Sequence, residues 1–351
     1  MNGDIRKPSL TGLTRNRMPV TISQAELCSF EPLHINNPLP LLVRPRVPGL
    51  NLATWLGHNR ELVGTHLREH GGLLFRGFTV SGPPEFEACV KAVSGELLEY
   101  IYRSTPRTRV AGKIYTSTTY PQSRSIPLHN EMSYSQSWPL KIWFLSVVPA
   151  QQGGRTPIAD SRKVFNRISR AVRERFTRRQ VMYVRNYGQG LDLPWQDVFQ
   201  TNEKSEVERL CRTVGIEFAW TANDGLTTRQ ICQAVAHHPQ TGEDVWFNQA
   251  HLFHVSSLDP AARELLLRTF TEGELPRHAF YGDGGAIEES ALEEIRDAFQ
   301  HEAVVFSWEK GDVLLLDNML TAHGREPYQG PRQVLTGMAE RCGIGGVCVE
   351  I

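Results

Sequence analysis

A histidine and a glutamate with metal-binding side chains stand two residues apart in the stretch PLHNEMSYSQSWP, which runs from Pro127 to Pro139. On a β-strand, residues i and i+2 point to the same face and lie about 6.5–7 Å apart along it. Pro127, just before the pair, favours an extended backbone. We therefore expect His129 and Glu131 to share a strand and to converge as two adjacent ligands of a first-row metal.

A third candidate ligand lies far along the chain, in the stretch LLLDNMLTAHGREPYQGPRQVL. His323 follows a hydrophobic strand and a short turn there, and two imidazoles with one carboxylate form the facial triad of non-haem Fe(II) oxygenases. Arg332 comes nine residues later, at the start of the last expected strand. If the metal binds a 2-oxo acid, this guanidinium can hold the far carboxylate in a bidentate contact that lysine cannot make.

The combination of these residues carries the specificity of the pattern. An H-x-E pair occurs by chance in many proteins, and alone it is more typical of a polar pair on a surface strand. A distant histidine followed by glycine, and then by a downstream arginine, makes the set far more specific. A cupin-like binding protein without activity stays open as an alternative, because a fold does not specify an activity. A pure binding module would not need all four side chains.

The composition is typical of an ordinary globular protein. Of the 351 residues, 40% are hydrophobic and 22% are charged. Lysine plus arginine and aspartate plus glutamate balance at 38 each, which argues against nucleic acid or a membrane surface as a partner. No apolar run approaches the roughly 18 residues that a membrane span needs. The basic N-terminus lacks the apolar stretch of a secretory signal.

The cysteines favour a cytoplasmic location. There are six of them, scattered along the chain without a C-x-x-C pair. We expect reduced thiols rather than a disulfide framework or a zinc knuckle. The positions are Cys28, Cys89, Cys211, Cys232, Cys342 and Cys348.

The hydrophobic pattern predicts a β core with helices outside it. Apolar residues recur at helical spacing over residues 52–70, 83–95, 161–179, 256–270 and 288–300. Ser161 and Asp259 are the expected N-caps of two of these helices. Strands are expected over residues 73–75, 141–149, 303–308, 312–318 and 332–340. The run 141–149 is apolar apart from Lys141 and Ser146, which indicates a strand buried on both faces.

These elements favour one domain with a sandwich or barrel core. The alternation of strand and helix that builds a parallel sheet is absent, and so are the G-x-G-x-x-G and P-loop motifs. Residues 1–40 are expected to be an irregular N-terminal arm, and residues 41–351 a single domain. Within it, the less regular segment of about 185–255 is expected to be an insertion that forms a lid over the site.

Four stretches together resemble a known family. GGLLFRGF, PLHNEMSY, GGRTPIADS and LLLDNMLTAHGREPYQGPR are similar to the taurine dioxygenase/clavaminate synthase-like superfamily of Fe(II)/2-oxoglutarate-dependent dioxygenases. LHNEMSY together with WFNQ resembles the branch that includes the aspartyl hydroxylase of syringomycin biosynthesis. The resemblance spans roughly residues 70–341. It implies a mainly β fold with peripheral helices, whose core is a double-stranded β-helix, or jelly roll.

The resemblance also implies the reaction and the site. His129, Glu131 and His323 match the iron ligands, Arg332 matches the arginine that binds 2-oxoglutarate, and Thr156 falls where the family places a threonine against that cosubstrate. The implied reaction is oxidative decarboxylation of 2-oxoglutarate to succinate and CO2 by O2, coupled to attack on an unactivated C–H bond. Halogenases of the broader class have a small residue in place of the carboxylate, so Glu131 argues against halogenation.

The substrate is the least defined part of this prediction. The branch suggests hydroxylation of an amino acid or an amino-acid-derived group, free or tethered to a carrier protein, in natural-product biosynthesis. Catabolic oxidation of a small sulfonate or carboxylate, desaturation and ring closure remain open alternatives. Ser133, Tyr134, Asn248 and Gln249 are candidate substrate contacts, although WFNQ is equally well read as a strand end. The oligomeric state is not predicted.

Other polar groups have weaker claims to chemistry. His237, His238, His251 and His254 lack a partner carboxylate or cysteine that would frame a zinc site, so we expect structural or pocket-lining roles. The basic segment 162–179 is typical of a solvated helix face. A sharper hypothesis is that this segment docks an acidic carrier protein. A hydrolase is disfavoured because no G-x-S-x-G motif occurs.

Overall fold

The structure is a computed structural model. This structure describes residues 24–344 except 36, 101, 103–106, 118–119, 189 and 223.

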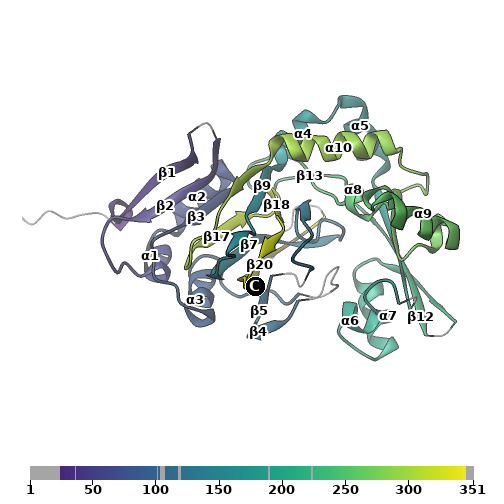
Figure 1. The fold of residues 1–351 in the computed structure, drawn as a ribbon, viewed down its shortest axis with the longest axis horizontal. Coiled ribbons are helices and arrows are strands. Elements are labelled where there is room, and N and C mark those ends of the chain that lie inside the picture. The colour runs from purple at the N-terminus through teal and green to yellow at the C-terminus, as the bar shows by residue number, and fades with distance from the viewer. Residues whose placement is uncertain are drawn as a thin grey trace, which may run out of the picture.

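The largest sheet has eight strands and runs through the centre of the molecule (Figure 1). Its pairs are antiparallel except for β2 with β3, which is parallel. In spatial order the strands are β1 (Cys28–His34), β2 (Asn37–Pro45), β3 (Gly72–Phe75), β17 (Val313–Asp317), β7 (Ser137–Val148), β20 (Gln333–Gly343), β5 (Ile114–Thr116) and β4 (Arg109–Ala111).

A second, four-stranded antiparallel sheet packs against one face of the large sheet. It consists of β16 (Val304–Phe306), β9 (Thr156–Asp160), β18 (Thr321–Arg325) and β6 (Ile126–His129). One hydrophobic cluster joins the two sheets, with Phe144 and Leu314 from the large sheet meeting Ile158 and Phe306 from the small one. The strands β8 (Gln152–Gly153) and β19 (Tyr328–Gln329) pair beside them. The core is therefore mainly β, as predicted.

Strand β7 confirms the prediction of a strand buried on both faces. Ile142 and Phe144 point into the cluster between the sheets, whereas Trp143 and Leu145 belong to a cluster on the opposite face of the large sheet. Side chains alternate along a strand, so two covered faces require a continuous apolar run rather than an alternating pattern.

Three helices cover that opposite face. They are α1 (Leu52–His58), α2 (Arg60–His70) and α3 (Pro83–Ser94), and α1 and α3 supply Trp55 and Phe86 to the cluster. The single helix expected over residues 52–70 is interrupted at Asn59, whose side chain donates to the carbonyl oxygen of Trp55 at 2.8 Å. Asparagine competes with the helix in this way by offering the backbone a local partner.

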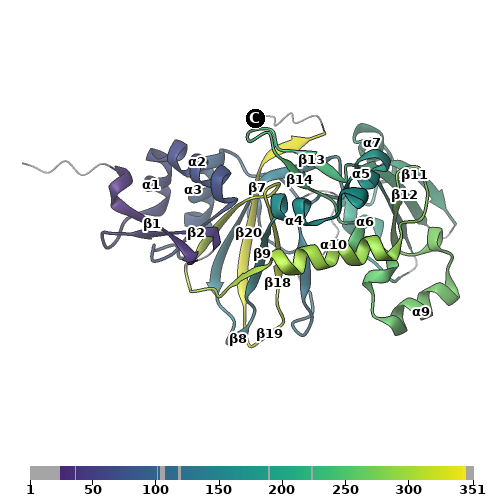
Figure 2. The ribbon, with the colours of Figure 1, turned by 90° about the horizontal axis from the view of Figure 1, so that it is seen from above.

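The helix expected over residues 161–179 is also two helices, α4 (Ser161–Arg167) and α5 (Arg170–Arg179). The predicted cap at Ser161 is wrong, because the carboxylate of Asp160 accepts from the backbone N–H of Arg162. Ser169 instead caps α5. Helix α10 (Glu289–Glu302) contacts α4 and β9, and in Figure 2 it extends from beside the small sheet toward α9. Asp259 caps α9 (Pro260–Thr269) as predicted.

The segment of about 185–255 is more regular than expected. It contributes to a third sheet in the order β11-β12-β10-β15 and contains a β-hairpin, β13 with β14. Buried residues of this region share one core cluster with the small sheet and with α4, α5 and α10. Its role as a lid remains a prediction. The elements here and nearby are β10 (Val181–Tyr187), α6 (Trp195–Phe199), α7 (Lys204–Thr213), β11 (Glu217–Thr221), β12 (Gly225–Cys232), β13 (Val235–His237), β14 (Asp244–Trp246), α8 (Ala250–Phe253), η2 (Val255–Ser257), η3 (Glu272–Glu274) and β15 (Arg277–Tyr281).

Two expectations about the ends of the chain need correction. The N-terminal region is not irregular as far as residue 40, because η1 (Gln24–Leu27), β1 and β2 are ordered elements and β1–β2 complete the large sheet. Cys342 is disulfide-bonded, so the expectation of six reduced thiols is wrong. Cys28, Cys89, Cys211 and Cys232 are free and buried. The cytoplasmic location remains a prediction.

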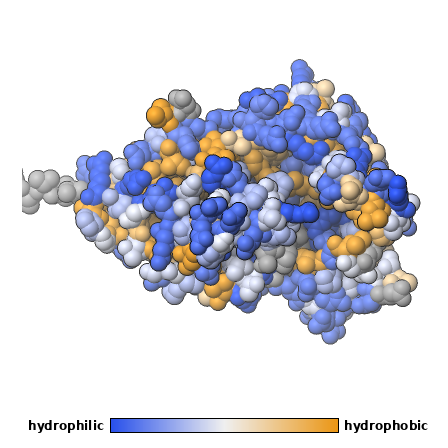
Figure 3. Space-filling model, viewed as in Figure 1, coloured by the Kyte–Doolittle hydropathy of each residue, from blue (hydrophilic) through white to orange (hydrophobic). Residues whose placement is uncertain are grey.

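The surface carries mixed polarity. Hydrophilic residues cover most of the face in Figure 3, with hydrophobic groups set between them. Within the described residues, none of the helices combines the length and the apolar character needed to cross a membrane.

Candidate metal centre

The two histidines are brought together by strand pairing across 194 positions of sequence. In the antiparallel register of β18 and β6, His323 lies directly opposite His129. The centroids of the two rings are 4.6 Å apart. Gly324 permits this close approach, since a Cβ atom there would lie 2.6 Å from the carbonyl oxygen of Ile126 on β6. The glycine of the A-H-G-R stretch is thus required by packing.

Glu131 does not lie on the strand of His129, which corrects the geometric argument from the H-x-E spacing. Strand β6 ends at His129, and Glu131 occupies the turn that follows. Asn318 fixes this turn from the loop after β17: its Oδ1 accepts from the Glu131 N–H at 2.7 Å and its Nδ2 donates to the Glu131 carbonyl at 2.9 Å. The carboxylate reaches the histidines because a buried amide holds its backbone, and not because of strand alternation.

The three predicted ligands meet in one cluster. One potential ligand atom from each of His129, Glu131 and His323 lies within 4.8 Å of the others. The Nδ1 of His129 is 2.8 Å from the carbonyl oxygen of Pro127, and donation of its N–H to that oxygen leaves Nε2 free to bind a metal. Burial lowers the pKa of both imidazoles below 6.5, so both are neutral and able to act as ligands at pH 7.

Arg107 completes the cluster and was not predicted from the sequence. Its Nη2 donates to Oε2 of Glu131 at 2.5 Å, and both side chains are buried. The guanidinium also lies 4.6 Å from the centroid of the Tyr100 ring. A carboxylate held by one oxygen presents its second oxygen to a metal. The only hint in the sequence is one arginine among several in a stretch without a motif, so this contact required the structure.

A pocket opens beside the histidines, between the two sheets. Its lining includes His129 and His323 together with Phe144, Thr156 and Arg332. The remaining lining residues are Arg107, Ser117, Ile126, Trp308, Gly324, Arg325 and Val334.

Arg332 lines this pocket as a half-buried cation, and it forms no ion pair with any of the residues that the structure describes. Its Nε has no hydrogen-bond partner in the part of the chain that the structure describes. Burial, and then the nearby charge of Arg325, lower the pKa of Arg332 to about 10, and the Tyr328 ring 5.5 Å away opposes the shift. Arg325 itself donates to the backbone carbonyls of Tyr120, Pro121 and Arg124. Arg332 is therefore the guanidinium in this pocket that fits the carboxylate of a 2-oxo acid.

Thr156 is oriented for the same purpose. Its Oγ1 accepts a hydrogen bond from Nε1 of Trp308 at 2.8 Å. An indole N–H only donates, so the hydroxyl proton of Thr156 remains available for a second contact. The donor set of the cluster fits Fe(II), and this end of the pocket fits the cosubstrate.

The four predicted substrate contacts lie elsewhere. Ser133, Tyr134, Asn248 and Gln249 are buried, and they are not among the residues that line the pocket. Their side chains bond to the backbone: Ser133 and Gln249 donate to the carbonyl of Asn130, and Tyr134 to that of Tyr102. Asn248 donates to the carbonyl of Ala234. Through Asn130, two of these side chains support the turn that carries Glu131.

The remaining histidines of the rival interpretation have structural partners. Nε2 of His238 pairs with the carboxylate of Asp317 at 3.0 Å, and the ring of His251 stacks on Phe299 at 4.8 Å. His254 packs against His278, with ring centroids 4.4 Å apart. In the described ranges, neither these residues nor His237 form part of a group of three metal-ligating side chains.

The basic segment is less cationic than its sequence indicates. Five of its arginines form ion pairs with carboxylates of the same chain, which lowers the positive charge available to an acidic partner. The pairs are Arg162–Asp160, Arg167–Glu302, Arg170–Glu174, Arg175–Glu288 and Arg179–Asp283.

Comparison with known proteins agrees with this geometry. Residues 36–339 match the family described as "Taurine catabolism dioxygenase TauD, TfdA family". The chain is 40% identical over 274 residues to the dapdiamide synthesis protein DdaC of Enterobacter agglomerans, which covers 78% of this chain and 83% of that protein. It is 28% identical over 324 residues to a clavaminate synthase-like protein of Arabidopsis thaliana, covering 87% of this chain and 94% of that protein.

A solved structure shares the fold. PvcB, described as an Fe, alpha-ketoglutarate dependent oxygenase from an isonitrile synthetic pathway, superposes with a TM-score of 0.52 at 15% identity, covering 92% of this chain and 94% of that chain. At this identity the likeness concerns the fold alone.

Proposed function

The chain belongs to the TauD/TfdA family of dioxygenases, and from this premise we propose that it oxidises an unactivated C–H bond of an amino acid or amino-acid-derived substrate in natural-product biosynthesis. As a member of this family it is a dioxygenase that uses Fe(II), 2-oxoglutarate and O2. The observation that carries the proposal is the imidazole–carboxylate–imidazole cluster beside a pocket that also contains Arg332, a guanidinium without an ion pair among the described residues.

Each side chain has a defined part in the proposed site. His129, Glu131 and His323 would hold the iron, which supplies the activation of O2 when it is bound. Arg332 and the hydroxyl of Thr156 would orient 2-oxoglutarate through its far carboxylate. The three ligands leave the other positions around the metal for the cosubstrate and O2.

The surroundings of the site support the same chemistry. Arg107 fixes Glu131 through one oxygen and so keeps the carboxylate pointed at the cluster. Phe144 and Trp308 line the pocket and limit the access of water to the reacting atoms.

We also propose that the two facing sheets form a double-stranded β-helix, within a single domain. The segment of about 185–255 would act as its lid. In support, Leu210 and Val214 of this segment line a second pocket together with Tyr102 and Met132, and Met132 directly follows Glu131. Glu99 and Arg341 also line this pocket. A carboxylate and a guanidinium at one pocket suit the ammonium and carboxylate groups of an amino acid.

The relatives favour a biosynthetic role over a catabolic one. DdaC is named for dapdiamide synthesis, and a biosynthetic substrate built from amino acids would agree with the second pocket. Oxidation of a small sulfonate or carboxylate remains the alternative. We favour hydroxylation, while desaturation and ring closure would use the same metal site with a different substrate pose.

The test is succinate release from 2-oxoglutarate by the Fe(II)-loaded protein in the presence of O2, across a panel of free and carrier-tethered amino acids and small sulfonates. A substrate is expected to stimulate succinate release. Hydroxylation adds one oxygen atom to the product mass, whereas desaturation or ring closure removes two hydrogen atoms. Stimulation by sulfonates alone would contradict the biosynthetic proposal. An absence of Fe(II)-dependent succinate formation with any compound, matched by an inactive His323→Ala variant, would contradict the activity itself.

A further inference from the structure

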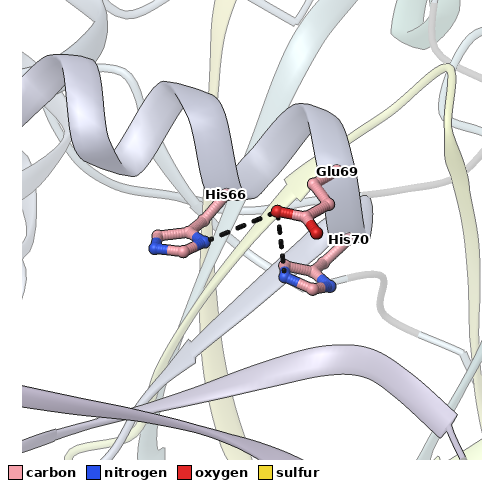
Figure 4. Close-up of side chains that lie close together, drawn as sticks. All are labelled: His66, Glu69 and His70. Atoms are coloured by element: carbon pink, nitrogen blue, oxygen red, sulfur yellow. Dashed lines mark ion pairs between the residues drawn. The ribbon is translucent and has the colours of Figure 1, made fainter.

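A second group of metal-ligating side chains lies at the end of α2, outside the site described above. Figure 4 shows the rings of His66 and His70 on either side of the carboxylate of Glu69. One potential ligand atom from each residue lies within 4.8 Å of the others. We propose that these three residues form a second binding site for a divalent transition-metal cation of the Zn²⁺, Ni²⁺ or Cu²⁺ class.

The helix itself positions the two imidazoles. His66 and His70 are separated by one helical turn, so they stand on the same face of α2. Their rings are stacked, with centroids 5.8 Å apart and an interplanar angle of 23°. Two histidines at i and i+4 on a helix are a recurrent zinc-binding arrangement. The sequence HLREH contains this spacing, although the H-x-E pattern elsewhere gave a more obvious signal.

The donor atoms are close to the separation that a bound ion imposes. Oε2 of Glu69 lies 3.9 Å from Nδ1 of His66 and 3.6 Å from Nε2 of His70. Ligands about 2.0–2.1 Å from a tetrahedral ion lie about 3.4 Å from one another. Glu69 is exposed, so rotation of its side chain can close the remaining difference without moving the helix.

Packing holds the ring of His66 in place, and its Nδ1 is available to a metal. Phe30 packs on the ring of His66, with centroids 4.6 Å apart. The buried Nδ1 of His66 has no hydrogen-bond partner among the described residues. A buried nitrogen that lacks a partner lowers stability, and a metal ion would satisfy it. Two nitrogens and one oxygen, with positions left for water, suit borderline cations better than Mg²⁺ or Ca²⁺.

The local electrostatics also permit a cation. The group occupies the last turn of α2, where the helix dipole favours positive charge. Arg68 lies in the same turn, and Arg162 donates to the carbonyl of Glu69. The charge of Arg162 is compensated by Asp160 and by Glu243, at 2.8 and 3.1 Å respectively.

A metal here would join three side chains at the end of α2, next to the residue through which the helix is hydrogen-bonded to β17 and β18. Gly71 directly follows the group, and its carbonyl accepts from the N–H of Asp317 at 3.0 Å and from Oγ1 of Thr321 at 2.9 Å. Asp317 ends β17 and Thr321 begins β18. The expected consequence of binding is therefore a higher unfolding temperature, because an ion that binds only the folded chain stabilises it.

The experiment counts Zn²⁺ equivalents bound by the full chain at equilibrium, in competition with a chromophoric chelator. The His66→Ala/His70→Ala variant is expected to bind one equivalent fewer than the wild type, and Glu69→Gln to bind the second ion at least threefold more weakly. His58→Ala is the matched control, since His58 is an exposed histidine at the end of α1 that lies outside the group. Zn²⁺ should also raise the unfolding temperature of the wild type by more than that of the double variant.

Equal stoichiometry in the wild type, the control and the double variant would overturn the proposal. The comparison counts the equivalent that is lost, so its outcome does not depend on whether the first site also binds Zn²⁺. Circular dichroism of each variant establishes that it is folded. If the double variant is unfolded, the binding shift of Glu69→Gln decides, and an unchanged affinity in that variant would equally overturn the proposal.

Discussion

Replacing Arg332 by methionine is expected to weaken 2-oxoglutarate binding without destabilising the protein. The side chain is half-buried in the pocket, and its buried Nε has no hydrogen-bond partner in the described chain. Methionine has a similar length and tolerates the apolar surroundings. The substitution therefore removes a charge that lowers the stability of the ligand-free fold and that a bound anion would compensate.

The magnitudes follow from the burial of this side chain. Burial lowers the pKa of Arg332 from 12.5 to about 10, which corresponds to roughly 3 kcal/mol against the charged form. Hydrogen bonds to a charged group contribute about 1.5–3 kcal/mol each. Two such bonds at the lower end of this range amount to about 3 kcal/mol, so their loss corresponds to a roughly 100-fold higher Kd for 2-oxoglutarate. Arg332→Lys keeps the charge but loses the fork, so an intermediate loss is expected.

The assay is anaerobic calorimetric titration of the Fe(II)-loaded protein with 2-oxoglutarate, together with a thermal melt of the metal-free protein. Arg332→Met should have a melting temperature equal to or above that of the wild type. A Kd within threefold of the wild-type value would refute the assignment of Arg332 to the cosubstrate. A melting temperature lowered by several degrees would refute the argument that the charge is uncompensated in the fold.

Three further predictions follow from the contacts described above. Arg107→Met leaves the carboxylate of Glu131 buried without its ion pair, so the metal-free protein should lose about 3–5 kcal/mol of stability. Adding Fe(II) should stabilise this variant by more than it stabilises the wild type, as measured by denaturant unfolding. Gly324→Ala should push β6 away from β18 and weaken Fe(II) binding at least tenfold in equilibrium dialysis, with an overpacking cost of about 1–3 kcal/mol; unchanged metal affinity would contradict it. Burial lowers the pKa of His254 to about 4 and of His278 to about 3, so the unfolded chain takes up protons first as the pH falls below 6.5 and stability is lost toward pH 4. A His278→Asn variant should therefore lose about 2 kcal/mol less between pH 7 and pH 5 than the wild type does, and equal losses would contradict this.

The candidate ligands were accessible from the sequence because side-chain chemistry is local information. An imidazole and a carboxylate two residues apart, with a distant histidine and arginine, suggest a metal site before any fold is known. The geometric reason was nevertheless wrong for Glu131, which lies in a turn and not on the strand of His129. The position of that turn depends on Asn318, a contact across 187 positions that no local pattern contains.

Contacts that no local pattern contains also explain why the two helix breaks and the role of Arg107 were not predicted. Hydrophobic periodicity continues through Asn59 and through Ile168–Ser169, so it predicts one continuous helix in each region. In the structure, side-chain and backbone contacts at these residues end one helix and begin the next. Arg107 belongs to the site through its ion pair with Glu131, and an arginine in a stretch without a motif carries no such signal. The β7 strand was predicted correctly because burial on both faces leaves a continuous apolar run.

The most direct test of the central claim is the anomalous diffraction of an anaerobic crystal soaked with Fe(II) and 2-oxoglutarate, recorded at the iron edge. The account predicts an anomalous peak among His129, Glu131 and His323, with the far carboxylate of 2-oxoglutarate against Arg332 and Thr156. An iron peak that lies away from those three side chains, or a cosubstrate carboxylate bound elsewhere, would contradict it.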